Sequence, residues 1–228
     1  MKNKTMRIAA VLLALTMMTS CFVGGTFAKY TTAGSSSDTA RVAKWGVKIT
    51  GVADIFSETY NEEDALYNLT AESVISNEPG KNVVAPGTAG TIADITIGGT
   101  PEVAARVEHK VSNISFDNWL VDTDADEIGD TFYCPMIFTI GTTVVNGADY
   151  IGNEAGLINH IVNVVAATHD VAPNVGLTGA QSLTITWSWP YEVNDLYNKY
   201  DTFLGDQAAD GNAAKVTIEV TTSVTQIN

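Results

Sequence analysis

Residues 183–189 read Leu-Thr-Ile-Thr-Trp-Ser-Trp, a strict alternation of apolar and small polar side chains. Successive side chains of a β-strand point to opposite faces, so this period of two is typical of a strand with one buried face. The same alternation recurs at 43–49, 93–97, 103–111, 132–140 and 216–224. Strands with one solvent-exposed face are typical of antiparallel sheets. The sequence therefore predicts an all-β fold, an antiparallel β-sandwich of the jelly-roll type with one or two short helices.

Helical spacing interrupts this pattern once. The apolar residues that repeat every three or four positions are Leu157, Ile158, Ile161, Val162 and Val165. With Asn153 as a cap, they predict one amphipathic helix over residues 154–168. A second short helical turn is a weaker prediction at 62–69.

Two connecting segments are expected between the strands. The pair Asn146 and Gly147 is typical of a tight turn after the strand at 132–140. The segment 194–213 is rich in polar residues, and we expect it to form a long loop.

The composition excludes several classes of protein. The chain has 228 residues, 45% of them hydrophobic and 17% charged, which is too apolar for a disordered tail. It carries 26 acidic and 12 basic side chains, for a net charge of −14. Nucleic acids and anionic lipid surfaces require clustered Lys and Arg, so neither is an expected partner.

The N-terminus has the pattern of an export signal. Lys2, Lys4 and Arg7 precede the apolar run at residues 8–15, which is too short to span a bilayer. Small residues at Thr26 and Ala28 predict cleavage by a signal peptidase between Ala28 and Lys29. A lipidated Cys21 remains an alternative first residue.

These features divide the chain into a signal peptide (1–28), an N-terminal arm (29–40) and a β-sandwich domain (41–228). The arm is rich in Ser, Thr and Gly and lacks a clear period, so we expect it to be flexible. Cys134 is the one cysteine that remains after cleavage, so no disulfide can form within the mature chain.

A search for catalytic motifs returns none. The three histidines, His109, His160 and His169, include no pair at the i, i+4 spacing of a zinc-protease helix. Neither a nucleophile elbow nor a phosphate-binding glycine loop is present. We expect His109 to be a hydrogen-bonded core residue, His160 to be solvated and Cys134 to be a buried, inert thiol. The sequence therefore predicts a protein that is not an enzyme and has no bound cofactor.

One acidic loop is a candidate calcium site. Asp122, Asp124 and Asp126 stand at alternate positions, from which carboxylate oxygens can converge on a hard cation. The EF-hand pattern fails, because Glu127 and Tyr133 occupy its glycine and glutamate positions. A solvated loop between strands is the alternative.

Three tyrosines form a candidate aromatic surface. Tyr191, Tyr197 and Tyr200 lie close together in sequence, and exposed rings of this kind can stack on sugars. Half-buried residues that anchor the loop are the alternative.

The signal region also carries a family resemblance. Residues 25–31, Gly-Thr-Phe-Ala-Lys-Tyr-Thr, resemble the signal peptide that is cut by the SipW-type signal peptidase of Gram-positive bacteria. The body is similar to exported proteins that carry this signal, with the TasA and camelysin groups as the wider relatives. The matching segments are 84–88, 99–104, 184–192, 201–205 and 224–227.

This resemblance implies a jelly-roll subunit secreted to the cell surface or biofilm matrix of a Gram-positive-type bacterium. In TasA-like fibres the freed N-terminal arm adds as a strand to the neighbouring subunit. Here that arm would begin with Lys29, Tyr30, Thr31 and Thr32, and the expected partner is a second copy of the chain. No membrane attachment is expected after cleavage.

Two alternative functions remain open. Camelysin relatives are called metallopeptidases, but the zinc helix is missing here and we do not transfer that activity. A monomeric glycan-binding module that uses the three tyrosines is the other alternative.

Overall fold

The structure is a computed structural model that describes residues 41–51, 56–60, 74–78 and 81–228. The predicted signal peptide, its cleavage residues Ala28 and Lys29, the arm and the predicted helix at 62–69 lie outside the described residues. Residues Val42–Asn228 form one compact unit.

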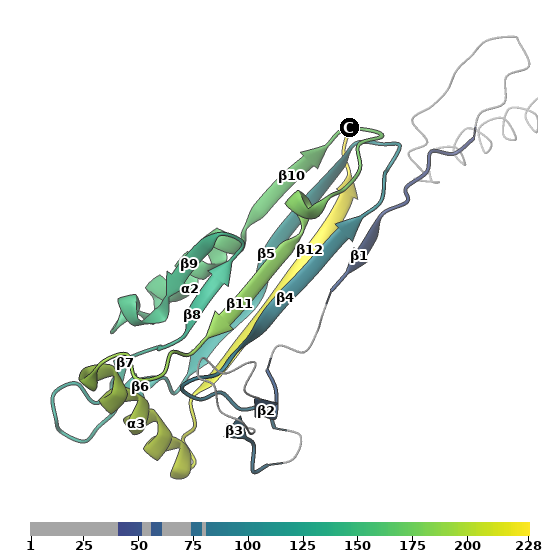
Figure 1. Cartoon of the computed structure of the whole chain (residues 1–228). Coiled ribbons are helices and arrows are strands. Elements are labelled where there is room, and N and C mark those ends of the chain that lie inside the picture. The colour runs from purple at the N-terminus through teal and green to yellow at the C-terminus, as the bar shows by residue number, and fades with distance from the viewer. Residues whose placement is uncertain (1–40, 52–55, 61–73, 79–80) are drawn as a thin grey trace, which may run out of the picture. The chain divides into compact units, whose positions relative to one another are not determined.

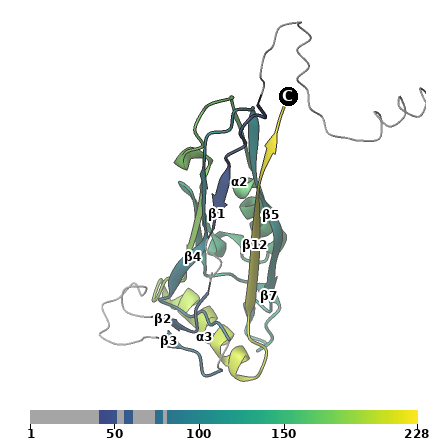
Figure 2. The same ribbon diagram turned by 90° about the vertical axis from the view of Figure 1, so that its right-hand side faces the viewer.

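Two larger antiparallel sheets make up this unit (Figures 1 and 2). In spatial order, the five-stranded sheet contains β1 (Lys48–Thr50), β4 (Ala89–Gly98), β11 (Leu183–Ser188), β8 (Ile137–Ile140) and β9 (Thr143–Asn146). The three-stranded sheet contains β10 (Ala167–Val171), β5 (Ala105–Asp117) and β12 (Lys215–Gln226). Two short antiparallel pairs join β2 (Thr59–Tyr60) to β3 (Val74–Ile75) and β6 (Leu120–Val121) to β7 (Thr131–Phe132). The all-β prediction is confirmed.

The alternation in the sequence corresponds to burial. In β11, Leu183, Ile185 and Trp187 are buried while Thr184 is exposed. β5 repeats the pattern, with Ala105, Val107 and His109 buried. These inward faces form one hydrophobic cluster that contains residues of both sheets.

Helix α2 (Glu154–Val165) confirms the predicted amphipathic helix. The Asn153 side chain caps it by accepting a hydrogen bond from the Gly156 N–H, and Leu157, Ile161 and Val165 are buried. The helix ends at Val165 rather than at residue 168, because the chain continues directly into β10. α2 packs against β5 and β9.

A second helix replaces the loop predicted at 194–213. Helix α3 spans Asp195–Ala209, and the Asn194 side chain caps it by accepting from the Tyr197 N–H. Tyr200 and Leu204 are its buried residues, one turn apart. The loop prediction was wrong because the polar composition concealed this helical spacing. Neither α-helix of the described chain is long and apolar enough to cross a membrane.

The strand predicted at 132–140 is broken in the middle. β7 ends at Phe132 and β8 begins at Ile137, with Pro135 between them. Proline has no N–H to donate to a sheet ladder, which explains the interruption. Tyr133, Cys134, Pro135 and Met136 are all buried, so this segment has no solvent face.

The tight turn predicted at Asn146 and Gly147 is also corrected. The β8–β9 hairpin turns instead at Gly141 and Thr142, and Gly141 has a φ of 57° that suits glycine. Asn146 caps a 3₁₀ turn, η1 (Gly147–Tyr150), by accepting from the Ala148 N–H.

Candidate functional site

The longest edge strand of the two larger sheets in the described chain is β12, with twelve residues. All twelve residues of β12 pair with β5 on one side. No other described strand pairs with β12, so it is an edge strand of the three-stranded sheet. Figure 2 shows β12 running along the outside of the domain.

The hydrogen-bond pattern identifies which groups of β12 point outward. The Ile227 N–H donates to the Ala104 carbonyl at 2.9 Å, so this opposed pair is hydrogen-bonded. Opposed residues of an antiparallel ladder alternate between bonded and non-bonded pairs. The residues whose N–H and C=O groups turn away from β5 are therefore Val220, Thr222, Val224 and Gln226.

This part of the edge has few of the usual protective features. Edge strands are commonly protected by charges, prolines, bulges or short length. Lys215, Glu219 and the bulge after Glu219 all lie in the first part of β12. Residues 220–226 contain no charged residue, proline or glycine. They therefore form an extended, β-prone segment that another strand can pair with.

A second strand edge that is only partly paired within the described residues lies on the same side of the domain. β1 pairs with β4 only at residues 96–98, and no described strand pairs with the outer side of β4 at residues 89–95. β12 contacts β4, and Figures 1 and 2 show β1 and β12 along this side. The opposite side is covered by α2, which packs against both β5 and β9.

His109 secures β12 from within the core, as the sequence predicts. Its Nε2 lies 2.9 Å from the Gln181 carbonyl oxygen and its Nδ1 lies 2.8 Å from the Thr222 hydroxyl. A carbonyl only accepts, so Nε2 carries the proton and Nδ1 accepts from Thr222. Burial lowers the pKa of His109, against the opposing effect of the Gln181 bond. The ring therefore acts as a neutral structural link between β5, β12 and η2 (Gly179–Gln181).

His160 differs from its prediction. It is half-buried, and its Nδ1 forms a hydrogen bond with the Tyr150 hydroxyl, because α2 places it against η1. It is not simply solvated.

Cys134 is fully buried, and burial raises its pKa to about 12. The thiol is therefore neutral and unreactive in the folded protein, as predicted.

The acidic loop between β6 and β7 does bring three carboxylates together. Oxygens of Asp122, Asp124 and Asp126 lie within 4.8 Å of one another. Among the described residues this is the one such group with metal-ligating character, and it contains no histidine.

Asp122 already has a structural role in this loop. Its carboxylate accepts from the N–H groups of Asp124, Ala125 and Glu127 at 2.7–3.0 Å. Burial raises the pKa of Asp122, but these three bonds outweigh burial, and the pKa lies below its ordinary value. Asp124 and Asp126 are exposed. Calcium binding by this loop stays a prediction.

The three tyrosines do not form one surface. Tyr191 is 46% exposed, Tyr197 is half-buried and Tyr200 is only 6% exposed. Tyr197 and Tyr200 pack on Tyr133, with ring centroids 5.6 and 5.1 Å away. The prediction of an exposed Tyr200 is corrected, because α3 turns this residue into the core.

No family model, characterised protein or solved structure matches the chain.

The open edge of β12 was not predicted from the sequence, although the strand at 216–224 was predicted. Which strand ends a sheet depends on long-range pairing, and the scarcity of charges in 220–226 is the one local signal.

Proposed function

We propose that this chain is a secreted structural protein of a bacterial surface or biofilm matrix, and that it assembles by strand addition. Residues 29–40 of one copy would pair with the outer edge of β12 in the next copy. A jelly-roll arrangement of the two sheets and a Gram-positive-type host belong to the same proposal.

The observation that supports the proposal best is the outward row of backbone groups on β12. Val220, Thr222, Val224 and Gln226 each direct an N–H and a C=O away from β5. An added strand can bond to these groups, and each main-chain bond contributes a net of about 1 kcal/mol. Main-chain pairing needs little side-chain specificity, which suits an arm rich in Ser, Thr and Gly.

The geometry of such a contact favours filaments. The donor and the acceptor are different parts of the chain, so the contact is head-to-tail. A head-to-tail contact extends into a fibre unless its rotation closes a ring. Pairing would also cover an edge that otherwise invites non-specific aggregation.

Negative-stain microscopy of four purified proteins tests the proposal. They are residues 29–228, residues 41–228, and Val224→Pro and Val224→Ala in the longer chain. Proline removes the outward N–H of Val224 and leaves the bonds to β5, whereas alanine shortens the side chain and keeps that N–H. We expect fibres from residues 29–228 and from Val224→Ala, and none from the other two.

Thermal unfolding is the control that each variant is folded. Fibres from residues 41–228 would contradict the role of the arm, and abundant fibres from folded Val224→Pro would contradict the β12 edge. Mass spectrometry of secreted protein tests export separately: we expect Lys29 as the first residue, and an intact residue 1–28 segment would contradict the signal.

A further inference from the structure

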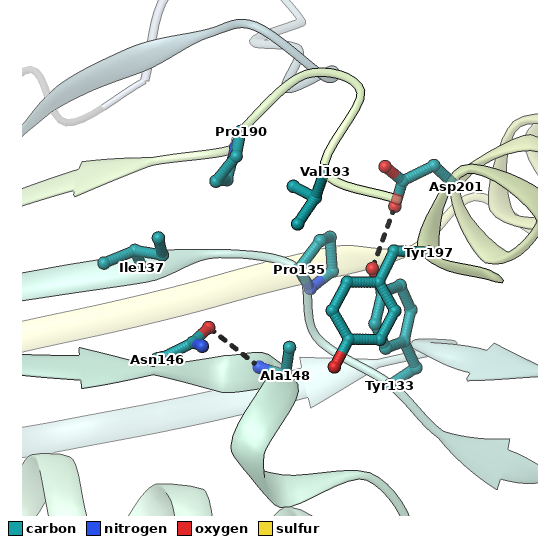
Figure 3. A pocket seen from close by; sticks show the side chains of 9 residues that line it. All are labelled: Tyr133, Pro135, Ile137, Asn146, Ala148, Pro190, Val193, Tyr197 and Asp201. Carbon is teal, nitrogen blue, oxygen red and sulfur yellow. Dashed lines mark hydrogen bonds between the residues drawn. The ribbon is translucent and has the colours of Figure 1, made fainter. Parts of the chain in front are cut away.

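A small cavity lies at the opposite end of β8 from its hairpin, between the start of that strand, the segment after β11 and helix α3 (Figure 3). Its volume is about 60 Å³. Apolar walls come from Pro135, Pro190 and Val193, and aromatic walls come from Tyr133 and Tyr197. Asp201 of α3 supplies a carboxylate to the lining.

This carboxylate lies in apolar surroundings. Burial raises the pKa of Asp201 to about 6, although neighbouring donors from Trp189 and Tyr133 act in the opposite direction. The Tyr133 hydroxyl donates to Asp201 Oδ1 at a long 3.3 Å. The Trp189 Nε1–H is near, but it is buried and forms no hydrogen bond of acceptable geometry. In the described chain no lysine or arginine forms an ion pair with Asp201.

The walls are suited to a cation on an alkyl stem. Tyr133 and Tyr197 have ring centroids 5.6 Å apart, and tyrosine faces attract cations. Val193 lines the cavity and is 52% exposed, so apolar surface continues from the cavity to its mouth. A carboxylate, two tyrosine rings and apolar walls together recognise a group that is positive at its tip and apolar behind it.

We propose that this cavity binds a primary ammonium group on a short alkyl chain, as found at the end of a lysine side chain of a partner polypeptide. The ammonium would donate to the Asp201 carboxylate, and the methylenes would lie against Pro135, Pro190 and Val193. The inference does not depend on the proposed assembly.

The volume is sufficient for the ligand. A single water requires roughly 10–15 Å³ of such space, so about 60 Å³ can hold an ammonium with part of its alkyl stem. A trimethylammonium group has no N–H to donate to the Asp201 carboxylate. The net charge of −14 also favours the approach of cations over anions.

Binding can be measured by isothermal titration and by chemical-shift changes at pH 8 in residues 41–228, the compact domain that we expect not to form fibres. The probes are n-butylammonium and Nα-acetyl-lysine-N-methylamide. Asp201→Asn keeps the shape of the side chain and removes its charge, and Asp206→Asn is the matched control at an exposed position of the same helix. We expect saturable binding that Asp201→Asn weakens by about tenfold or more and Asp206→Asn leaves unchanged.

A pH series gives a second measurement that needs no variant. Binding should be strong at pH 8 and weak at pH 5, where Asp201 is protonated. The other titratable groups lining the cavity are the phenols of Tyr133 and Tyr197, and burial raises the pKa of Tyr133 further from this range. The nearby Glu192 and Lys199 do not line it.

Four controls decide the outcome. Butanol, butyrate, butyltrimethylammonium and glycinamide should each bind at least tenfold more weakly than n-butylammonium. The proposal would be overturned if any of these controls bound as well as n-butylammonium, or if Asp201→Asn bound the probes as well as the unaltered protein. It would also be overturned by the lack of saturable binding of either probe, or by binding that is the same at pH 5 and pH 8.

Discussion

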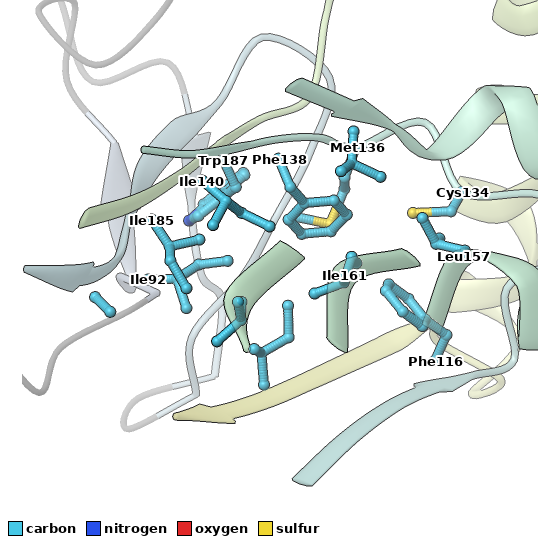
Figure 4. Close-up of a cluster of buried hydrophobic side chains, with 14 of the residues drawn as sticks. Ile92, Phe116, Cys134, Met136, Phe138, Ile140, Leu157, Ile161, Ile185 and Trp187 are labelled. Carbon is cyan, nitrogen blue, oxygen red and sulfur yellow. The ribbon is translucent and has the colours of Figure 1, made fainter. Parts of the chain in front are cut away.

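Replacement of Leu157 by alanine tests how firmly α2 closes one side of the domain. Leu157 is fully buried, and Figure 4 shows it beside Cys134 in the same cluster as Phe116. The change removes three carbon atoms, worth about 2.4 kcal/mol at about 0.8 kcal/mol for each buried group. A residual cavity of roughly 60 Å³ would add about 1.5 kcal/mol. We therefore expect the free energy of unfolding to fall by about 4 kcal/mol.

Urea denaturation followed by tryptophan fluorescence measures this loss, because Trp119 and Trp187 are buried. For a domain of this size the same loss corresponds to a fall in melting temperature of roughly 8–16 °C. Asn159→Ala, at an exposed position of the same helix, is the control and should change stability by less than about 0.5 kcal/mol. A loss below about 1.5 kcal/mol for Leu157→Ala, with an unchanged denaturant slope, would refute the docking of α2 through this residue.

Three further predictions concern single residues. Gly147→Ala should lower the free energy of unfolding by about 1–3 kcal/mol, because a Cβ at that position would lie 2.5 Å from the Cys134 carbonyl oxygen. Gly179→Ala is the control: its Cβ would meet open space, so stability should not change. Urea denaturation compares the two variants. In an NMR titration the midpoint of the His109 ring should lie below its ordinary pKa of about 6.5. The neutral ring therefore contributes to stability above that pH, and this contribution is lost as the pH falls below about 6.5. A midpoint above about 6.5 would be contrary evidence. Asp122→Ala should lower the melting temperature in both EDTA and calcium buffers, while Asp124→Ala should leave it unchanged in both; a calcium-dependent melting temperature would instead favour a bound ion.

Sequence patterns correctly predicted the strands and the helix in which buried side chains recur at one regular spacing along the chain. The alternation at 183–189 became β11, and the spacing of Leu157, Ile161 and Val165 became α2. Patterns failed where burial was not one-sided. Residues 133–136 are covered on all sides, so their alternation carried no information about pairing.

Helix α3 was missed although the signals for it were present. Asn194 is a good N-cap, and Leu196, Tyr197, Tyr200 and Leu204 follow a helical spacing. Seven polar residues between 194 and 206 obscured that spacing, because α3 contacts the core along only a narrow face.

The candidate site was less predictable than the fold. The outward groups of β12 are backbone atoms, so no side-chain motif marks them. The Asp201 cavity combines Tyr133 with Pro190 and Asp201, which follow it by more than fifty residues, and the three meet only after α3 docks. Such a site follows from tertiary packing rather than from spacing along the chain.

The enclosed thiol of Cys134 has a practical consequence. A maleimide dye cannot reach it until the strands around it separate, so the labelling rate reports how often the domain opens. Since Cys21 lies in the predicted signal peptide, processed protein would carry this single natural reporter, and subunits in a fibre could be compared with free subunits without any engineered probe.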